Sequence, residues 1–179
     1  MKVLALGGSG GMGRFSSFAI SNYPNISKVT IADLNEAKAI EFSNHFDDRF
    51  TGIGLDVTNK EHLEKVMSDH DVVLNTTGPF FKFGLPILKS AIKCKCHYFD
   101  ICDDWEPTEE MLKLNDEALK NDITAIVGLG ASPGISNLLG LKAMNELDET
   151  ESIITGWDVS SAKPEDESSQ KGTNAAMEH

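Results

Sequence analysis

The clearest chemical signal in the sequence is a glycine-rich stretch, GGSGGMG, at residues 7–13. Gly8, Gly10 and Gly13 follow the spacing G-x-G-x-x-G, which is typical of a loop that holds the pyrophosphate of a dinucleotide. We expect Gly8 to permit a tight turn, Gly10 to let the backbone approach the phosphates, and Gly13 to let a helix pack closely on a sheet. The alternative is a strand-to-helix turn that binds no ligand.

A carboxylate follows this loop at the distance that a dinucleotide site requires. Asp33 ends the next expected strand, about twenty residues beyond the loop. It can accept hydrogen bonds from the 2′ and 3′ hydroxyls of an adenosine ribose, and it would repel a 2′-phosphate. The next residues are Leu34 and Asn35, with no arginine. We therefore predict NAD as the preferred cofactor, with NADP possible, and tighter binding of NADH than of NADPH. As an alternative, Asp33 serves only as a helix cap.

A second group of reactive side chains lies in HYFDICDDW, residues 97–105. Asp103 and Asp104 lie furthest toward the C-terminal end of an expected strand, and parallel sheets bind ligands at that end. Each could act as an acid–base group or bind a substrate ammonium, so both are candidate catalytic residues. The alternative for both is a solvated acidic loop with Asp104 near a helix start.

The glycine stretch also reads G-x-x-G-x-x-G from residue 7, a variant that occurs in short-chain dehydrogenases. Those enzymes need a Tyr-x-x-x-Lys pair, in which the lysine lowers the pKa of the tyrosine for proton transfer. Neither Tyr23 nor Tyr98 is followed four residues later by a lysine. Short-chain chemistry is therefore disfavoured.

The elements that would position these motifs alternate between short apolar runs and helical patterns. This alternation predicts an α/β fold, a doubly wound parallel sheet of the Rossmann type with helices on both faces. Thr58 and Glu61 have the spacing of a capping box, and Pro86 suits the first turn of a helix. Strands are expected at residues 2–6, 28–33, 51–56, 71–79, 97–101 and 123–129, and helices from Met12, at 35–46, after Thr58, around Pro86, at 108–121 and at 135–148.

The character of the chain changes after about Asp148. SIITGWDVSS is one possible strand, and the segment that follows it is polar and loop-like. We therefore expect residues 1–148 to form the dinucleotide-binding domain. Residues 149–179 are expected to be the truncated beginning of a second α/β domain that serves substrate binding or dimerisation.

Composition excludes several classes of partner. The chain carries 16 basic and 28 acidic residues, a net charge of −12, which repels nucleic acid and anionic membranes. Three cysteines and a start at MKVLAL without a signal peptide predict a cytoplasmic protein with reduced thiols. Cys94 and Cys96 lack a second ligand pair, so no metal site is predicted.

Four stretches taken together resemble the saccharopine dehydrogenase family, and more narrowly its saccharopine reductase and lysine 6-dehydrogenase-like members. The stretches are GGSGGMG (7–13), NTTGPF (75–80), YFDICDDW (98–105) and GLGASPGISNLLG (128–140). The resemblance covers about residues 1–150. It implies an NAD(P)-dependent oxidoreductase that transfers a hydride to or from a C–N bond of an amino-acid-like or polyamine-precursor substrate, with a homodimer as one possible assembly.

The resemblance also implies roles for individual residues. The pyrophosphate contacts are expected at Gly8, Ser9, Gly10, Gly11 and Met12. Asp33 would hold the adenosine ribose, and Asp56 and Val57 would lie near the adenine. Asp33 departs from those NADP-dependent members that place a basic residue after the second strand.

The nicotinamide side is expected at the ends of two later strands. Thr76, Thr77, Gly78 and Pro79 end the fourth strand, beside the point where the strand order of a doubly wound sheet reverses; the alternative is a simple β-turn. The loop around 128–137 is a poor second phosphate loop, because Pro133 has no backbone N–H. Its candidate substrate-side residues are Ser132, Pro133, Gly134 and Asn137, where Asn137 either starts the next helix or faces the ligand, and a purely structural turn is the alternative.

Two classes of function stay open. The chain is expected to supply the cofactor domain of an oxidoreductase, or to be a non-catalytic dinucleotide-binding module or sensor. The family's substrate domain is largely missing from these 179 residues, which puts a complete substrate pocket in doubt. Fold alone does not decide between the two classes.

Overall fold

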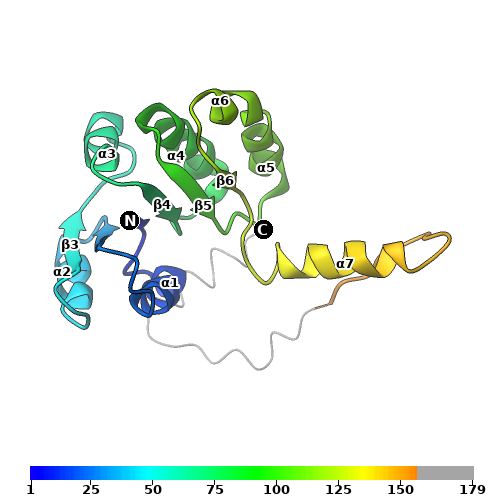
Figure 1. Ribbon diagram of the computed structural model, residues 1–179, viewed down its shortest axis with the longest axis horizontal. Coiled ribbons are helices and arrows are strands. Elements are labelled where there is room, and N and C mark those ends of the chain that lie inside the picture. Colours follow the sequence, from blue (N-terminus) through cyan, green and yellow to red (C-terminus); the bar gives the residue numbers. More distant parts are fainter. Residues whose placement is uncertain (157–179) are drawn as a thin grey trace.

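The computed structural model describes residues 1–156. In this part of the chain, parallel strands form one sheet in the order β3-β2-β1-β4-β5-β6 (Figure 1). This is the strand order of doubly wound dinucleotide-binding domains, and it confirms the expected Rossmann-like fold. The strands are β1 (Lys2–Leu6), β2 (Lys28–Asp33), β3 (Phe50–Gly54), β4 (Val72–Asn75), β5 (His97–Asp100) and β6 (Ala125–Ile126).

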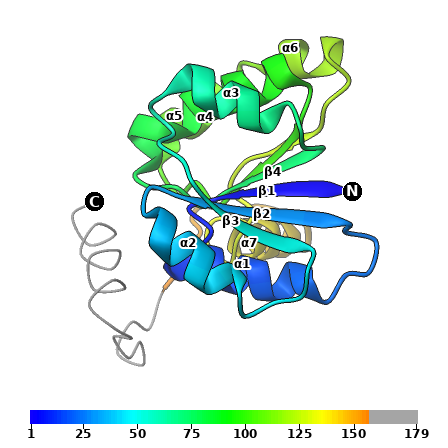
Figure 2. The same cartoon turned by 90° about the vertical axis from the view of Figure 1, so that its left-hand side faces the viewer.

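Helices lie on both faces of the sheet. Figure 2 shows α1 and α2 on one face and α3, α4, α5 and α6 on the other. The last helix, α7, extends away from the strands in Figure 1 and buries none of its residues. The helices are α1 (Gly11–Ser21), α2 (Glu36–Ser43), α3 (Lys60–Met67), α4 (Phe80–Cys94), α5 (Trp105–Leu112), α6 (Asn115–Lys120) and α7 (Ile135–Asn145).

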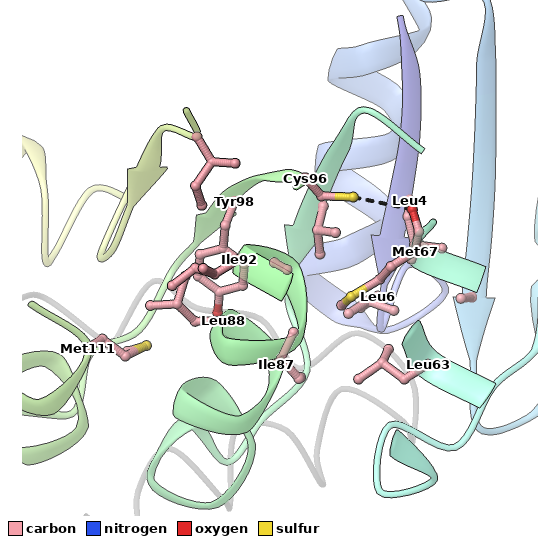
Figure 3. Close-up of a cluster of buried hydrophobic side chains, with 14 of the residues drawn as sticks. Leu4, Leu6, Leu63, Met67, Ile87, Leu88, Ile92, Cys96, Tyr98 and Met111 are labelled. Atoms are coloured by element: carbon pink, nitrogen blue, oxygen red, sulfur yellow. Dashed lines mark hydrogen bonds between the residues drawn. The ribbon is translucent and has the colours of Figure 1, made fainter. Parts of the chain in front are cut away.

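Strand alternation divides the core into two clusters. Leu4 and Leu6 of β1 face α3 and α4, where they join Leu63, Met67 and other buried side chains (Figure 3). Val3 faces the opposite way and joins a cluster built by β2, α2 and β3. Burial of each large apolar side chain stabilises the fold by about 1.5–3 kcal/mol. The sheet is therefore packed against apolar side chains on both of its faces.

Several predicted elements are confirmed. Strand β2 has the predicted bounds, and α2 lies within the predicted range 35–46. Asn35 caps α2, because its side-chain oxygen accepts a hydrogen bond from the N–H of Lys38 at 3.1 Å. The buried residues of α3 include Leu63 and Met67, as its helical spacing predicts.

The predicted capping box of α3 is wrong. Asn59, not Thr58, is the N-cap, and its side chain accepts a hydrogen bond from the N–H of His62 at 3.1 Å. Thr58 instead donates its hydroxyl to Asp56 at 2.7 Å. The preceding carboxylate therefore takes the hydroxyl that the capping box needs.

The expected position of Pro86 is also wrong. Helix α4 begins at Phe80, so Pro86 lies inside it rather than in its first turn. A proline inside a helix removes one hydrogen bond and costs roughly 3 kcal/mol. The helix continues because Phe80, Ile87 and Leu88 are buried in the core beside the sheet.

Two predicted elements are shorter or divided. The helix expected at 108–121 is two helices, α5 and α6, which each bury one residue, Met111 or Ala118, in the same cluster. The strand expected at 123–129 is reduced to the two residues of β6. Gly128, with φ of +74°, turns the chain out of the extended conformation soon after them.

The predicted second domain lies mostly outside the described residues. Residues 149–156 contain no helix or strand, and the possible strand in SIITGWDVSS extends past the described part. Among the described residues, no helix is both long and apolar enough to cross a membrane.

Candidate functional site

The glycine loop joins the end of β1 to the start of α1. Gly7 has φ of +67°, and its carbonyl accepts a hydrogen bond from the N–H of Gly10 at 2.9 Å. The residue with the turn conformation is therefore Gly7, whereas the spacing predicts Gly8. Gly8 has a different constraint, because a Cβ there would lie 2.9 Å from the carbonyl oxygen of Ala5.

Close packing at Gly13 agrees with its predicted role. A Cβ on Gly13 would lie 2.1 Å from the carbonyl oxygen of Gly7, far inside any van der Waals contact. The glycine thus lets α1 start directly against the loop. The buried residues of α1 are Gly13 and Ser17, so the helix approaches the sheet through small side chains.

The outer side of the loop is open. A Cβ on Gly11 would meet nothing within 4 Å, and one on Gly10 would meet only the Gly7 carbonyl oxygen, at 3.1 Å. Among the described residues, the backbone N–H groups of residues 11–13 have no protein acceptor. Free N–H groups and the helix dipole at such a terminus attract an anion. The loop therefore fits a pyrophosphate, with Ser9 at its edge and Met12 exposed beside it.

Asp33 is held in place at the end of β2. Ser9 Oγ donates a hydrogen bond to one carboxylate oxygen at 2.6 Å, and the N–H of Asn35 donates to the other at 3.1 Å. The cap of α2 is Asn35, so Asp33 is not merely a helix cap. The carboxylate thus lies beside the glycine loop, as a ribose-binding group must, and that binding role stays a prediction.

Asp56 and Val57 follow β3 at the same edge of the sheet. Asp56 is exposed, and one of its carboxylate oxygens accepts hydrogen bonds from the N–H and hydroxyl of Thr58, at 2.8 and 2.7 Å. These bonds, the hydroxyl first, lower the pKa of the Asp56 carboxyl. Val57 is half-buried against the core. Contact of this pair with an adenine remains a prediction.

The segment after β4 lies against the glycine loop. Thr76 donates its N–H to the carbonyl of Leu6 at 2.9 Å, and its hydroxyl lies 2.8 Å from that oxygen and 3.2 Å from the carbonyl oxygen of Gly7. A Cβ on Gly7 would lie 3.1 Å from the Thr76 backbone. The end of β4 therefore packs directly on the turn that follows β1.

Thr77 carries an unused hydroxyl at this position. Its Oγ1 is buried and has no hydrogen-bond partner within residues 1–156. A buried polar atom without a partner costs about 1–3 kcal/mol, which a ligand can remove by bonding to it. Gly78 is exposed with open space at its Cβ position, and the Gly78–Pro79 peptide bond is cis. Contact of this segment with the nicotinamide half of a cofactor remains a prediction.

The two candidate catalytic carboxylates have different surroundings. Asp103 is exposed. Asp104 is half-buried, is the N-cap residue of α5, and accepts a hydrogen bond from the N–H of Phe81 at 3.0 Å. Asp104 therefore ties α5 to the first turn of α4, next to Pro79. A catalytic role for Asp103 or Asp104 stays a prediction.

The second glycine-rich loop is hydrogen-bonded where it enters α7. Gly134, with φ of +117°, is the N-cap of α7, and it donates its N–H to the side chain of Asn137 in the first turn of that helix at 3.1 Å. Ser132 is exposed, and the Ser132–Pro133 peptide bond is cis. Contact of this loop with a substrate remains a prediction.

Sequence reasoning missed a buried polar group at the ends of β4 and β5. Asn75 and Asp100 are fully buried and pair in register, with buried Tyr98 hydrogen-bonded to both. Burial raises the pKa of the Asp100 carboxyl, and burial followed by the nearby Asp100 charge raises that of Tyr98 well above its ordinary value. The available signal was a polar residue closing each of two apolar strands.

Comparisons with known proteins agree with this geometry. Saccharopine dehydrogenase (NADP(+), L-glutamate-forming) from Schizosaccharomyces pombe is 28% identical over 119 residues, 66% of this chain and 25% of that protein. The Saccharomyces cerevisiae protein of the same name is 33% identical over 95 residues, 53% of this chain and 20% of that protein. The chain thus spans a quarter or less of the curated relatives it matches.

A solved structure and a family model extend the match. Apo histidine-tagged saccharopine dehydrogenase (L-Glu forming) from Saccharomyces cerevisiae has a TM-score of 0.69 at 29% identity, covering 81% of this chain and 31% of that chain. The model described as the saccharopine dehydrogenase NADP binding domain matches residues 3–126. Because that match spans more than half of the sequence, the chain belongs to the family of the saccharopine dehydrogenase NADP-binding domain.

Proposed function

We propose that this chain is the cofactor-binding part of an oxidoreductase that acts on a C–N bond of an amino-acid-like substrate. The observation that carries the proposal is the open N-terminus of α1. It lies between the fixed carboxylate of Asp33 and the hydroxyl of Thr77, which has no partner in the described part of the chain. These groups lie where the strand order reverses between β1 and β4, and doubly wound sheets bind dinucleotides at that point.

Each part of the site has its own task in binding a nicotinamide dinucleotide. The N–H groups of residues 11–13 hold the pyrophosphate, and Gly10 leaves room for it. Asp33 accepts hydrogen bonds from the adenosine ribose, and Asp56 and Val57 flank the adenine. Thr77 binds the nicotinamide half. When bound, the cofactor supplies the hydride chemistry, and the protein orients it.

The proposed reaction class rests on the relatives, which are named as L-glutamate-forming saccharopine dehydrogenases. Asp103 and the loop around Ser132 are the groups of this chain proposed to face such a substrate. Asp103 would accept a proton or bind an ammonium group. The rest of the substrate pocket would come from residues beyond the matched domain.

The choice between NAD and NADP has two opposed arguments. The names of the family model and relatives favour NADP and give no support to the predicted NAD preference. The local argument for NAD is Asp33, because a carboxylate repels a 2′-phosphate. We therefore assign a nicotinamide dinucleotide as the cofactor and propose that Asp33 sets the discrimination at the 2′ position.

Fluorescence titration of the purified chain with NADH and NADPH tests the binding site. Gly10→Val places a branched side chain in the pyrophosphate position, and we expect it to weaken binding by about 100-fold or more, which corresponds to roughly 2.8 kcal/mol. Gly156→Val is the control for the same substitution away from the loop, since a Cβ on Gly156 meets nothing within 4 Å. Unchanged affinity in a folded Gly10→Val protein would contradict the proposed site.

A further inference from the structure

A continuous chain of hydrogen bonds runs inside the sheet from the end of β4 to the end of β5. The Asn75 side chain accepts from the N–H of Thr77 at 3.0 Å and donates through Nδ2 to the Tyr98 hydroxyl at 3.0 Å. The Tyr98 hydroxyl donates to Asp100 Oδ2 at 2.8 Å. The segment that contains Thr77 is thereby connected to a buried carboxylate on the neighbouring strand.

The same carboxylate holds the second glycine-rich loop. Asp100 Oδ1 accepts hydrogen bonds from the N–H groups of Gly128 at 2.8 Å and Cys102 at 3.0 Å. The backbone carbonyl of Asp100 accepts from the N–H of Leu129 at 2.7 Å. Both oxygens of one carboxylate are therefore used, one toward the end of β4 and the other toward the start of the 128–134 loop.

Stability alone gives a poor account of this arrangement. Asn75, Tyr98 and Asp100 are each fully buried, and no ion pair to Asp100 is found within residues 1–156. A buried charge without a cationic partner costs free energy even when it is hydrogen-bonded, and apolar replacements of such groups are often neutral or stabilising. The network therefore does something that an apolar core would not do, namely fix two loops relative to each other.

We propose that Asn75, Tyr98 and Asp100 are positioning residues that hold the 76–79 segment and the 128–134 loop at a set separation, so that the nicotinamide half of the cofactor is bound in one orientation. The inference rests on the proposed function, which places that half at Thr77. The proposed function places the adenosine half at the ends of β2 and β3, on the other side of β1 from these three residues.

Tyr98 is the residue that can be tested most cleanly. Its hydroxyl accepts from Asn75 and donates to Asp100, so a phenylalanine of nearly the same volume breaks the connection at its centre. Tyr23→Phe is the matched control, because Tyr23 is the other tyrosine of the chain and is exposed. Asp100→Asn is a second variant, which keeps the size of the side chain while replacing one acceptor by a donor.

The experiment compares a whole dinucleotide with its adenosine half. Affinities for NADPH and NADH, and for the fragments 2′,5′-ADP and ADP, are measured on wild type and on the three variants. We expect Tyr98→Phe and Asp100→Asn to weaken binding of the dinucleotides by about tenfold, roughly the effect of one lost hydrogen bond to a ligand, and to leave the fragments within about twofold. Tyr23→Phe should change none of them.

Hydrogen exchange supplies a readout that needs no ligand. The amide hydrogens of residues 76–78 and 128–130 should exchange faster in Tyr98→Phe than in wild type, while β1 and β2 keep their protection. Equal losses for dinucleotide and fragment, or no change in either, would overturn the positioning role. If wild type binds no dinucleotide, the proposed function fails, and unchanged exchange in both segments would separately refute the connection between the loops.

Discussion

The two glycine-rich loops, residues 7–13 and 128–134, each lead into a helix. They differ in whether the N–H groups at the start of that helix are hydrogen-bonded. At the first loop, the N–H groups of the first turn of α1 have no protein acceptor among the described residues. At the second loop, Gly134 donates to Asn137, Ile135 donates to Gly130 at 2.9 Å, and Ser136 also has a backbone acceptor. The two loops therefore share glycine but differ in their free backbone donors, and such donors are what an anion requires.

Both loops depend on glycine for packing, and the reasons differ. At Gly13 a Cβ would strike the Gly7 carbonyl because the helix starts so close to the strand. At Gly134 a Cβ would lie 2.2 Å from the Gly130 carbonyl oxygen, in a backbone with φ of +117°. The first glycine brings free donors close to a ligand position, and the second folds a loop back on itself.

The largest expected effect is a loss of stability caused by a substitution in the first loop. Gly13→Ala should destabilise the fold by about 3 kcal/mol or more, because its Cβ would overlap the Gly7 carbonyl oxygen. Urea unfolding followed by circular dichroism measures the change. Gly11→Ala is the control, since its Cβ meets nothing within 4 Å, and equal stability of the two variants would contradict the close approach.

A smaller effect concerns ligand choice at the first loop. Asp33→Ala should raise the affinity for NADPH relative to NADH by about tenfold, because the charge that repels a 2′-phosphate is gone. Competitive titration of both cofactors measures the ratio. Asp48→Ala, which removes an exposed carboxylate, should leave it unchanged. A constant ratio in Asp33→Ala would show that other groups discriminate at the 2′ position.

The smallest expected effect is a loss of stability at the second loop. Asn137→Ala removes the side-chain acceptor for the Gly134 N–H and should cost about 1 kcal/mol, the usual value of a helix cap. Thermal unfolding measures that loss. Affinity for the adenosine fragment ADP should stay within about twofold, because Asn137 lies outside the proposed phosphate site. A large loss of affinity with little loss of stability would mean that Asn137 faces the ligand.

The sequence predicted the sheet well because its information is local. Apolar runs separated by helical patterns imply parallel strands, and the spacing from Gly8 to Asp33 marks the first unit of the fold. The bounds of β2 followed from its β-branched run between polar residues. Such features need no knowledge of what lies next to them in space.

The sequence-based predictions failed where a residue distant in the sequence determines the local conformation or contact. The turn at Gly7 lies against Thr76, which is 69 residues away in the sequence. The Thr76 hydroxyl lies 3.2 Å from the Gly7 carbonyl oxygen, and a Cβ on Gly7 would lie 3.1 Å from the Thr76 backbone. Asp104 is used at the start of α4, a contact that strand spacing does not reveal. The Asn75–Asp100 pair becomes visible only when β4 and β5 are known to be adjacent.

The short hydrogen bond between Ser9 and Asp33 has a consequence for binding entropy. With Asn35 bonded to the other oxygen, the carboxylate already occupies one rotamer before a ligand arrives. Ordering a free side chain on binding costs about 0.5–1.5 kcal/mol. The Asp33 side chain is already ordered in the folded protein, so that cost does not arise on binding. In the proposed site, Ser9 would therefore raise affinity without touching the ribose, because it keeps the carboxylate that accepts the ribose hydroxyls from moving.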